Sequence, residues 1–201
     1  TMAHVDTLGA VVAEIKSNGR LRLSPVGGFN ANNAEAHNCR VYTYDGQIYE
    51  GTIQLADASL HVNKEYSTTQ RTFQSVEVVL DEPVTSKDDV KALGITNGCF
   101  VCADPNLVVT NSGYIKSRFL DDKLSAAILL GYAKYIRENN ITPLRKVYQH
   151  MTVFEEVGHG ACASIPEDVT ELLSVDMGCV GDGLECTERQ VSICAKDGHG
   201  P

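Results

Sequence analysis

The sequence contains no apolar run that approaches the roughly 20 residues of a transmembrane helix. It also lacks a cluster of lysine and arginine, and its formal net charge is -9 at pH 7. Nucleic acids and anionic membranes are recognised through basic patches, so we expect no nucleic acid and no membrane as a partner. The first residues show no charged segment followed by an apolar one, the pattern of a secretory signal. We therefore expect a soluble protein.

Cysteine usage argues against a disulfide framework. Seven cysteines are an odd number, spread from Cys39 to Cys194, and this pattern favours reduced thiols and a cytoplasmic location. Cys99 and Cys102 have the spacing of a zinc knuckle, but no second pair of ligands accompanies them. We expect these two residues to be buried thiols.

The chain is long enough and apolar enough to fold. Its 201 residues are 43% hydrophobic, which permits one domain or two small ones with a buried core. Thr1 leads almost directly into a candidate ligand, and residues 197–201 end the chain in turn-forming residues. We expect a fragment of a longer protein.

Short β-branched runs alternate with turn signals in the first half of the chain. Residues 18–19 (Asn-Gly) and 45–46 (Asp-Gly) each predict a hairpin between two such runs. Thr85 or Ser86 is expected to cap a short helix. The expected strands cover residues 8–15, 21–23, 40–44, 47–53, 74–80, 100–103 and 107–110, and a long loop covers residues 56–71. The spacing predicts a small β-barrel or sandwich domain at residues 7–110.

The second half of the chain shows a different pattern. Asp121 or Asp122 can cap a helix that runs to about Asn139. The other expected elements are strands at residues 146–154, 173–177 and 190–195 and a short helix at residues 166–172. Alternating strands and helices indicate an α/β layer. We expect an α/β fold in which residues 1–6 and 111–201 form one incomplete domain and the β domain is an insertion.

Two adjacent acids follow the apolar run that ends at Phe154. Neighbouring residues on a regular strand face opposite ways, so Glu155 and Glu156 can serve one site only if the chain turns there. Residues 157–160, Val-Gly-His-Gly, supply such a turn. One acid can then bind a metal ion while the other takes a proton from water. The alternative is a pair of exposed surface acids.

Other acids also stand at the expected ends of elements. Residues two apart on a strand share a face, so the Asp6 carboxylate can hydrogen-bond the His4 ring and set its tautomer. The Asp121-Asp122 pair at a loop-to-helix junction can cap the helix or bridge two cations. Asp176 ends an apolar run, and open α/β sheets place their sites at the carboxyl ends of strands. Taken singly, each also fits a surface residue, a cap or a turn.

The order of these signals resembles the dinuclear metallo-aminopeptidases. The likeness is greatest to metallopeptidase family forty-two, the glutamyl or deblocking aminopeptidases that form tetrahedral particles. The matching stretches are residues 3–9, 25–28, 93–95, 120–123, 154–158 and 175–176.

The resemblance implies a role for each candidate residue. His4, Asp121 and Asp176 would bind one divalent metal ion, Asp121 would bridge to a second, and Glu156 would bind the second. Glu155 would be the general base, with Asp6 assisting through His4. Zn or Co are the expected ions.

The resemblance also has structural implications. The peptide bond between the two aspartates at 121–122 would be cis. Residues 1–6 and 111–201 would belong to a zinc-peptidase-like α/β catalytic domain, with residues 7–110 as its inserted β domain. A homo-oligomer, a dodecamer, is expected.

The sequence departs from the family pattern at both ends. The pattern calls for a later histidine as a ligand of the second metal, and His199 comes too early to be that residue. Strands that would precede His4 in the catalytic sheet are also missing. We expect this chain by itself to hold metal weakly or at one site.

The implied reaction is hydrolysis of the N-terminal peptide bond of peptide substrates. Two cations would acidify a bridging water and polarise the carbonyl, while Glu155 carries the proton to the leaving amine. One alternative is a glycoside hydrolase, whose two acids stand roughly 5 to 9.5 Å apart. The other is a non-catalytic module for binding or assembly.

Overall fold

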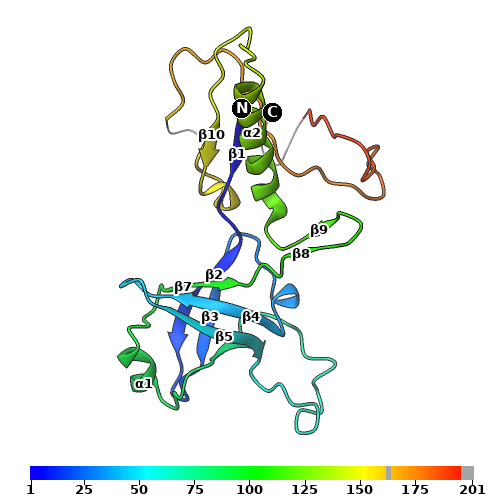
Figure 1. Cartoon of the computed structure of the whole chain (residues 1–201). Helices are drawn as coiled ribbons and strands as arrows, with labels where there is room; N and C mark the ends of the chain where they lie inside the picture. Colours follow the sequence, from blue (N-terminus) through cyan, green and yellow to red (C-terminus); the bar gives the residue numbers. More distant parts are fainter. Residues whose placement is uncertain (162–163, 196–201) are drawn as a thin grey trace. The chain divides into compact units, whose positions relative to one another are not determined.

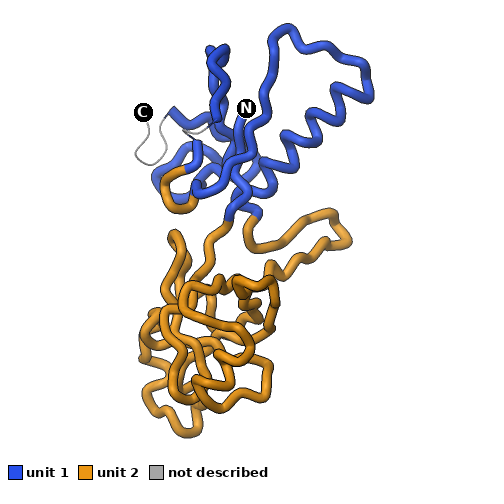
Figure 2. Tube along the Cα trace, turned by 90° about the vertical axis from the view of Figure 1, so that its left-hand side faces the viewer, with its two compact units in different colours: residues 1–6, 120–155, 160–201 blue, residues 7–119, 156–159 orange. Residues whose placement is uncertain are grey.

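The structure is a computed structural model that describes residues 1–161 and 164–195 (Figure 1). The chain divides into two compact units (Figure 2). The barrel unit comprises residues 7–119 and 156–159, and the helix unit comprises residues 1–6, 120–155 and the chain from residue 160 onward.

The barrel unit contains six antiparallel strands. They are β2 (Gly9–Ile15), β3 (Leu21–Val26), β4 (His37–Tyr42), β5 (Ile48–Leu55), β6 (Val76–Leu80) and β7 (Phe100–Ala103). They close into a barrel in the order β2-β3-β6-β5-β4-β7. Of the two folds that the sequence allowed, a barrel or a sandwich, the chain forms the barrel. The two predicted hairpins, β2-β3 and β4-β5, are confirmed.

Alternating side chains of these strands fill the barrel. On β3, Leu21 and Leu23 are buried while Arg22 between them is partly exposed, and β5 buries Ile53 and Leu55 in the same way. Full burial of each such aliphatic side chain contributes about 1.5–3 kcal/mol. The barrel interior is therefore the main core of the described chain.

A buried acid on β6 is paired rather than isolated. Glu77 is almost fully buried, and its two carboxylate oxygens accept hydrogen bonds from Lys16 and Arg20, each at 2.6 Å. Both basic residues flank the β2-β3 turn. Because a buried unpaired carboxylate is costly, this pair of contacts fixes the turn against β6.

Three smaller elements accompany the barrel. They are η1 (Ala31–Asn33), α1 (Lys87–Ala92) and the hairpin of β8 (Val108–Val109) with β9 (Ile115–Lys116). Ser86 caps α1 as predicted, because its side chain accepts from the Asp89 N–H and the Asp89 carboxylate accepts from the Ser86 N–H. Gly94, at φ +82°, follows the end of this helix.

The helix unit is built around three parallel backbone segments. β1 (Met2–His4) pairs in parallel with β10 (His150–Thr152), and Met2 also forms a parallel bridge with Ser174. The helix α2 (Leu120–Glu138) packs on β1 through Ala126 and Leu129, which contact Ala3. The predicted helix is thus confirmed. The short 3-10 turn η2 (Glu155–Val157) follows β10.

Four predicted elements of the second half are wrong or much shorter. Only His150–Thr152 of the strand predicted at 146–154 is formed, and the segment predicted as a helix at 166–172 contains a single turn and no helix. The segment 173–177 contains one bridge residue, and residues 190–195 form no strand. A strand requires a neighbour for its backbone hydrogen bonds, and residues 190–195 have no such neighbour among the described residues. Their apolar side chains are exposed accordingly, with Val191 at 89% and Ile193 at 95%.

The described cysteines are all free thiols. Cys99 is buried as predicted, whereas Cys102 is only partly buried. Burial raises the pKa of Cys39 to about 12, which keeps that thiol protonated. Among the described residues, no helix combines the length and the apolar composition needed to cross a membrane.

Replacing Ser86 by alanine should destabilise the barrel unit. The substitution removes the side-chain acceptor of the α1 cap, and such losses cost about 1 kcal/mol. Urea unfolding followed by circular dichroism measures the change. Ser67→Ala in the exposed loop is the control and should be neutral. An equal effect of the two substitutions would contradict the assigned cap.

The same cap should make stability depend on pH. The pKa of Asp89 lies below its ordinary value of 3.8, chiefly because the Thr85 N–H donates to the carboxylate, with a further bond to Ser86. A lowered folded-state pKa stabilises the fold above the ordinary pKa, and this stabilisation is lost as pH falls through the folded-state value. The difference in unfolding free energy between the natural protein and Asp89→Asn should therefore shrink below pH 3.8. A difference independent of pH would refute this origin, and Asp57→Asn serves as the control.

Candidate metal centre

Backbone hydrogen bonds bring the ends of three parallel segments to one edge of the helix unit. On one side of β1, the Met2 N–H donates to the Leu173 carbonyl and the Val175 N–H donates to the Met2 carbonyl, both at 2.9 Å. On the other side, the Val5 N–H donates to the Thr152 carbonyl at 3.0 Å. Because the three segments are parallel, their carboxyl ends meet at the same edge. The residues that follow these ends are the candidate site residues.

Three of the predicted ligands form a compact set. His4, Asp121 and Asp176 each offer a ligand atom, and these atoms all lie within 4.8 Å of one another. His4 Nε2 is 3.0 Å from Asp121 Oδ1 and 3.9 Å from Asp176 Oδ2. Ligand atoms around a tetrahedral zinc ion stand roughly 3.3–3.6 Å apart, as follows from metal–ligand distances of about 2.0–2.2 Å. One nitrogen and two carboxylate oxygens at this spacing fit a divalent cation.

Asp6 lies beside the other nitrogen of the His4 ring. His4 Nδ1 is 3.2 Å from the Asp6 backbone carbonyl and 3.4 Å from its Oδ1. A proton on Nδ1 is therefore well placed to be donated to Asp6, and Nε2 then presents its lone pair toward Asp121 and Asp176. This tautomer is the one that a metal ligand requires.

Glu155 stands at the open side of the set. Its Oε2 is 3.5 Å from His4 Nε2, while the side chain is 48% exposed. The Glu155 backbone N–H donates to Asp6 Oδ1 at 3.2 Å, so Asp6 contacts both His4 and Glu155. Glu155 can thus reach both the ligand atoms and solvent.

The two adjacent aspartates point to different surroundings. The peptide bond between Asp121 and Asp122 is cis, and both residues have non-helical backbone angles at the start of α2. Asp121 faces His4 Nε2, whereas Asp122 is almost fully buried and its Oδ2 accepts from the His4 backbone N–H at 3.1 Å. The sequence did not predict this role of Asp122. The only sequence signal was the presence of two acids at a junction that needs one cap.

The electrostatics of the set reflect burial and crowding of acids. Burial favours the neutral His4 ring, but the hydrogen bond with Asp121 and the charges of the neighbouring acids outweigh it and raise the pKa of His4. Burial raises the pKa of Asp176 to about 6, opposed by the Met177 N–H and supported by the charges of Asp122 and Asp121. A group of acids that raises the proton affinity of its members also attracts a cation.

One predicted ligand, Glu156, is not part of this set. Glu156 falls in the barrel unit, where its backbone carbonyl lies 2.7 Å from a Cβ placed on Gly27. Gly27 has φ +64°, so a side chain there would meet both the backbone strain and this contact. His199 lies outside the described residues.

Comparison with known proteins identifies the family to which the chain belongs. The sequence pattern of the family described as M42 glutamyl aminopeptidase matches residues 1–201. YhfE of Bacillus subtilis, whose name marks it as a candidate aminopeptidase, is 44% identical over 199 residues, which are 99% of this chain and 58% of YhfE. Lysyl aminopeptidase of Pyrococcus furiosus is 23% identical over 156 residues, which are 78% of this chain and 43% of that protein.

Solved structures share the fold. An aminopeptidase from the archaeon Desulfurococcus kamchatkensis has a TM-score of 0.63 at 25% identity, over 78% of this chain and 40% of that one. The TET1 peptidase of Pyrococcus horikoshii has a TM-score of 0.62 at 26% identity, over 78% of this chain and 45% of that one. The chain spans about three fifths of the length of YhfE and less than half of the others. Since the family pattern covers every residue, the chain belongs to the M42 glutamyl aminopeptidase family.

Proposed function

We propose that the natural protein is a metal-dependent aminopeptidase, and that the helix unit is part of its zinc-peptidase-like α/β catalytic domain. The observation that carries the proposal is the set of three ligand atoms from His4, Asp121 and Asp176 at metal-binding spacing. Family membership supports it independently. The peptide substrate would be cleaved at its N-terminal peptide bond.

In this proposal Asp6 and Asp122 position the site. The Asp122 carboxylate accepts a hydrogen bond from the His4 backbone N–H, and Asp6 lies beside Nδ1 of the His4 ring. The ring is therefore restrained at two points, so Nε2 stays directed at the ligand position. Divalent cations bound there, Zn or Co, supply Lewis acidity that polarises a carbonyl and makes water more acidic.

Glu155 is the proposed general base. It is half exposed, which lets it exchange protons with water, and its Oε2 lies within 3.5 Å of a ligand atom. In that position it takes a proton from the attacking water and returns it to the leaving amine. Glu156 is kept as the predicted ligand of a second ion. The barrel unit corresponds to the inserted β domain in this proposal.

We also propose that the natural protein is a homo-oligomer. The TET1 peptidase of Pyrococcus horikoshii, at 26% identity, can assemble into a tetrahedron or a large octahedral shell. A dodecamer remains the predicted form here.

Metal binding by the chain itself can be measured directly. Titration with Zn²⁺ or Co²⁺ in a calorimeter should show one weak site, because only three ligands come together in the described residues. Asp121→Asn should weaken it about tenfold or more, since even partners outside the ligand set account for 10–100-fold. Asp57→Asn, in an exposed loop, should change nothing. Binding that survives Asp121→Asn unchanged would remove Asp121 from the site.

Glu155→Gln in the natural full-length protein should separate chemistry from metal binding. We expect kcat to fall about 10²-fold or more, because a proton acceptor is lost, while metal content stays the same. Hydrolysis of aminoacyl anilides and metal analysis by mass spectrometry give the two values. Glu167→Gln, an exposed residue, is the matched control. Unchanged turnover would refute the assignment.

The same preparation tests the glycoside hydrolase alternative. Chelation should abolish peptide hydrolysis, and Zn²⁺ or Co²⁺ should restore it, because the carboxylate-pair mechanism of glycosidases needs no metal. Hydrolysis of glycosides that resists chelation would favour the alternative.

A further inference from the structure

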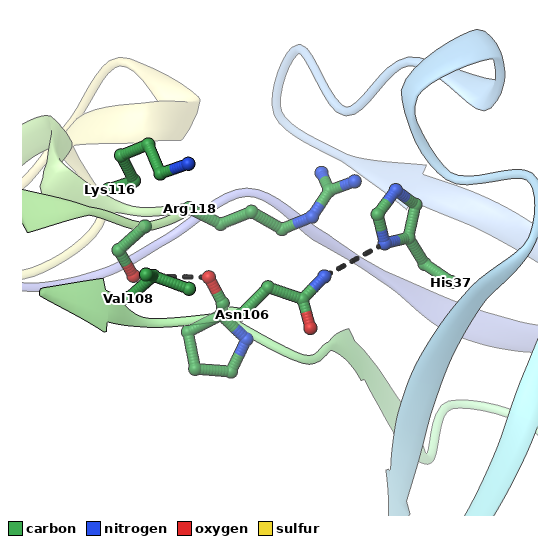
Figure 3. A pocket seen from close by; sticks show the side chains of 7 residues that line it. His37, Asn106, Val108, Lys116 and Arg118 are labelled. Carbon is green, nitrogen blue, oxygen red and sulfur yellow. Dashed lines mark hydrogen bonds between the residues drawn. The ribbon is translucent and has the colours of Figure 1, made fainter. Parts of the chain in front are cut away.

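The barrel unit carries a basic pocket that the proposed reaction does not use. It has a volume of about 350 Å³, and its polar side chains are those of His37, Asn106, Lys116, Ser117 and Arg118 (Figure 3). It lies where β4 begins, beside the β8-β9 hairpin and the segment that follows it. All of its lining residues belong to the barrel unit.

The pocket is positively charged in a chain of net charge -9. Lys116 and Arg118 line it, and no acidic side chain does. Asp104, which precedes the pocket residue Pro105, is paired with Arg40 at 3.3 Å. Among the described residues, none of the ion pairs includes Lys116 or Arg118. Two cations are thus gathered here, and no carboxylate of the described residues forms an ion pair with either.

The walls of the pocket are held by hydrogen bonds. The Pro105 carbonyl accepts from the Arg118 N–H at 2.8 Å and from Ser117 Oγ at 3.1 Å. The Arg118 guanidinium also donates through Nη2 to the Asn33 carbonyl. A guanidinium has five N–H donors, so one such bond orients the group and leaves the others for a ligand.

His37 adds a neutral donor to the same pocket. Asn106 Nδ2 lies 3.1 Å from His37 Nδ1, and because the amide nitrogen can only donate, the imidazole proton belongs on Nε2 (Figure 3). Burial, aided by the charge of Arg118, lowers the pKa of His37, which keeps this tautomer neutral. Side chains of three kinds, guanidinium, ammonium and imidazole, therefore line the pocket.

We propose that this pocket binds a small oxyanion, of the phosphate or the carboxylate class. Oxyanions accept several hydrogen bonds at once, and a planar guanidinium with a nearby ammonium group complements them in charge and geometry. The pocket is a second site, separate in residues from the proposed metal centre. Its ligand need not be the peptide that the metal centre would cleave.

Titration of the chain with inorganic phosphate and with glutarate tests the proposal and distinguishes the two classes. Binding is followed by the imidazole signals of His37 in NMR spectra at constant ionic strength. We expect saturable binding of at least one probe. Arg118→Gln and Lys116→Gln should each weaken it about tenfold or more, because each removes a charged hydrogen-bond donor.

Matched controls separate a built site from general charge attraction. Arg189→Gln and Lys64→Gln remove exposed cations elsewhere and should leave affinity unchanged. Arg118→Gln also removes the hydrogen bond to the Asn33 carbonyl and could alter the local fold. Lys116 is exposed, so Lys116→Gln tests the pocket without that effect. Saturation by phosphate alone, or by glutarate alone, assigns the class. Absence of saturable binding, or affinity unaffected by both pocket substitutions, would overturn the proposal.

Discussion

The candidate site depends on the backbone pairing of β1, which lies between β10 and the segment around Ser174. The three parallel segments carry His4, Glu155 and Asp176 at or just beyond their carboxyl ends, although these residues are far apart in the chain. A parallel arrangement aligns such ends without any contact between the side chains themselves. The same edge would be lost if either neighbour of β1 were displaced, because each side is held by only a few hydrogen bonds.

The start of α2 completes this arrangement. Ala126 and Leu129 pack the helix on Ala3, which brings the paired aspartates to the edge where β1 ends. Asp122 is then buried against the His4 N–H, and Asp121 is left to face the His4 ring. A buried carboxylate without a partner is costly, so this contact ties the helix to the strand that bears the first ligand. Packing and polar contacts thus join the same two elements, α2 and β1.

The barrel unit is stabilised differently. Its closed order of six strands leaves no open sheet edge in the barrel, and its aliphatic interior is the largest core of the described residues. The charges of the two units also differ in kind. The helix unit gathers the acids that would hold cations, whereas the barrel unit gathers Lys116 and Arg118 in a pocket without acids. The chain therefore has a local basic surface although its formal net charge is -9.

Local signals in the sequence were sufficient for the hairpins, for the Ser86 cap and for the helix that begins at the paired aspartates, because turn chemistry and capping depend on neighbouring residues. The order of the acids along the chain was sufficient to predict the family. Element limits in the second half were predicted poorly: residues 173–177 pair with β1 only around Ser174, and residues 190–195 have no neighbour to pair with among the described residues. Closure of the barrel, the burial of Asp122 and the gathering of the basic pocket were decided only by tertiary structure. Each requires contacts between residues distant in the chain, and no local pattern encodes such contacts.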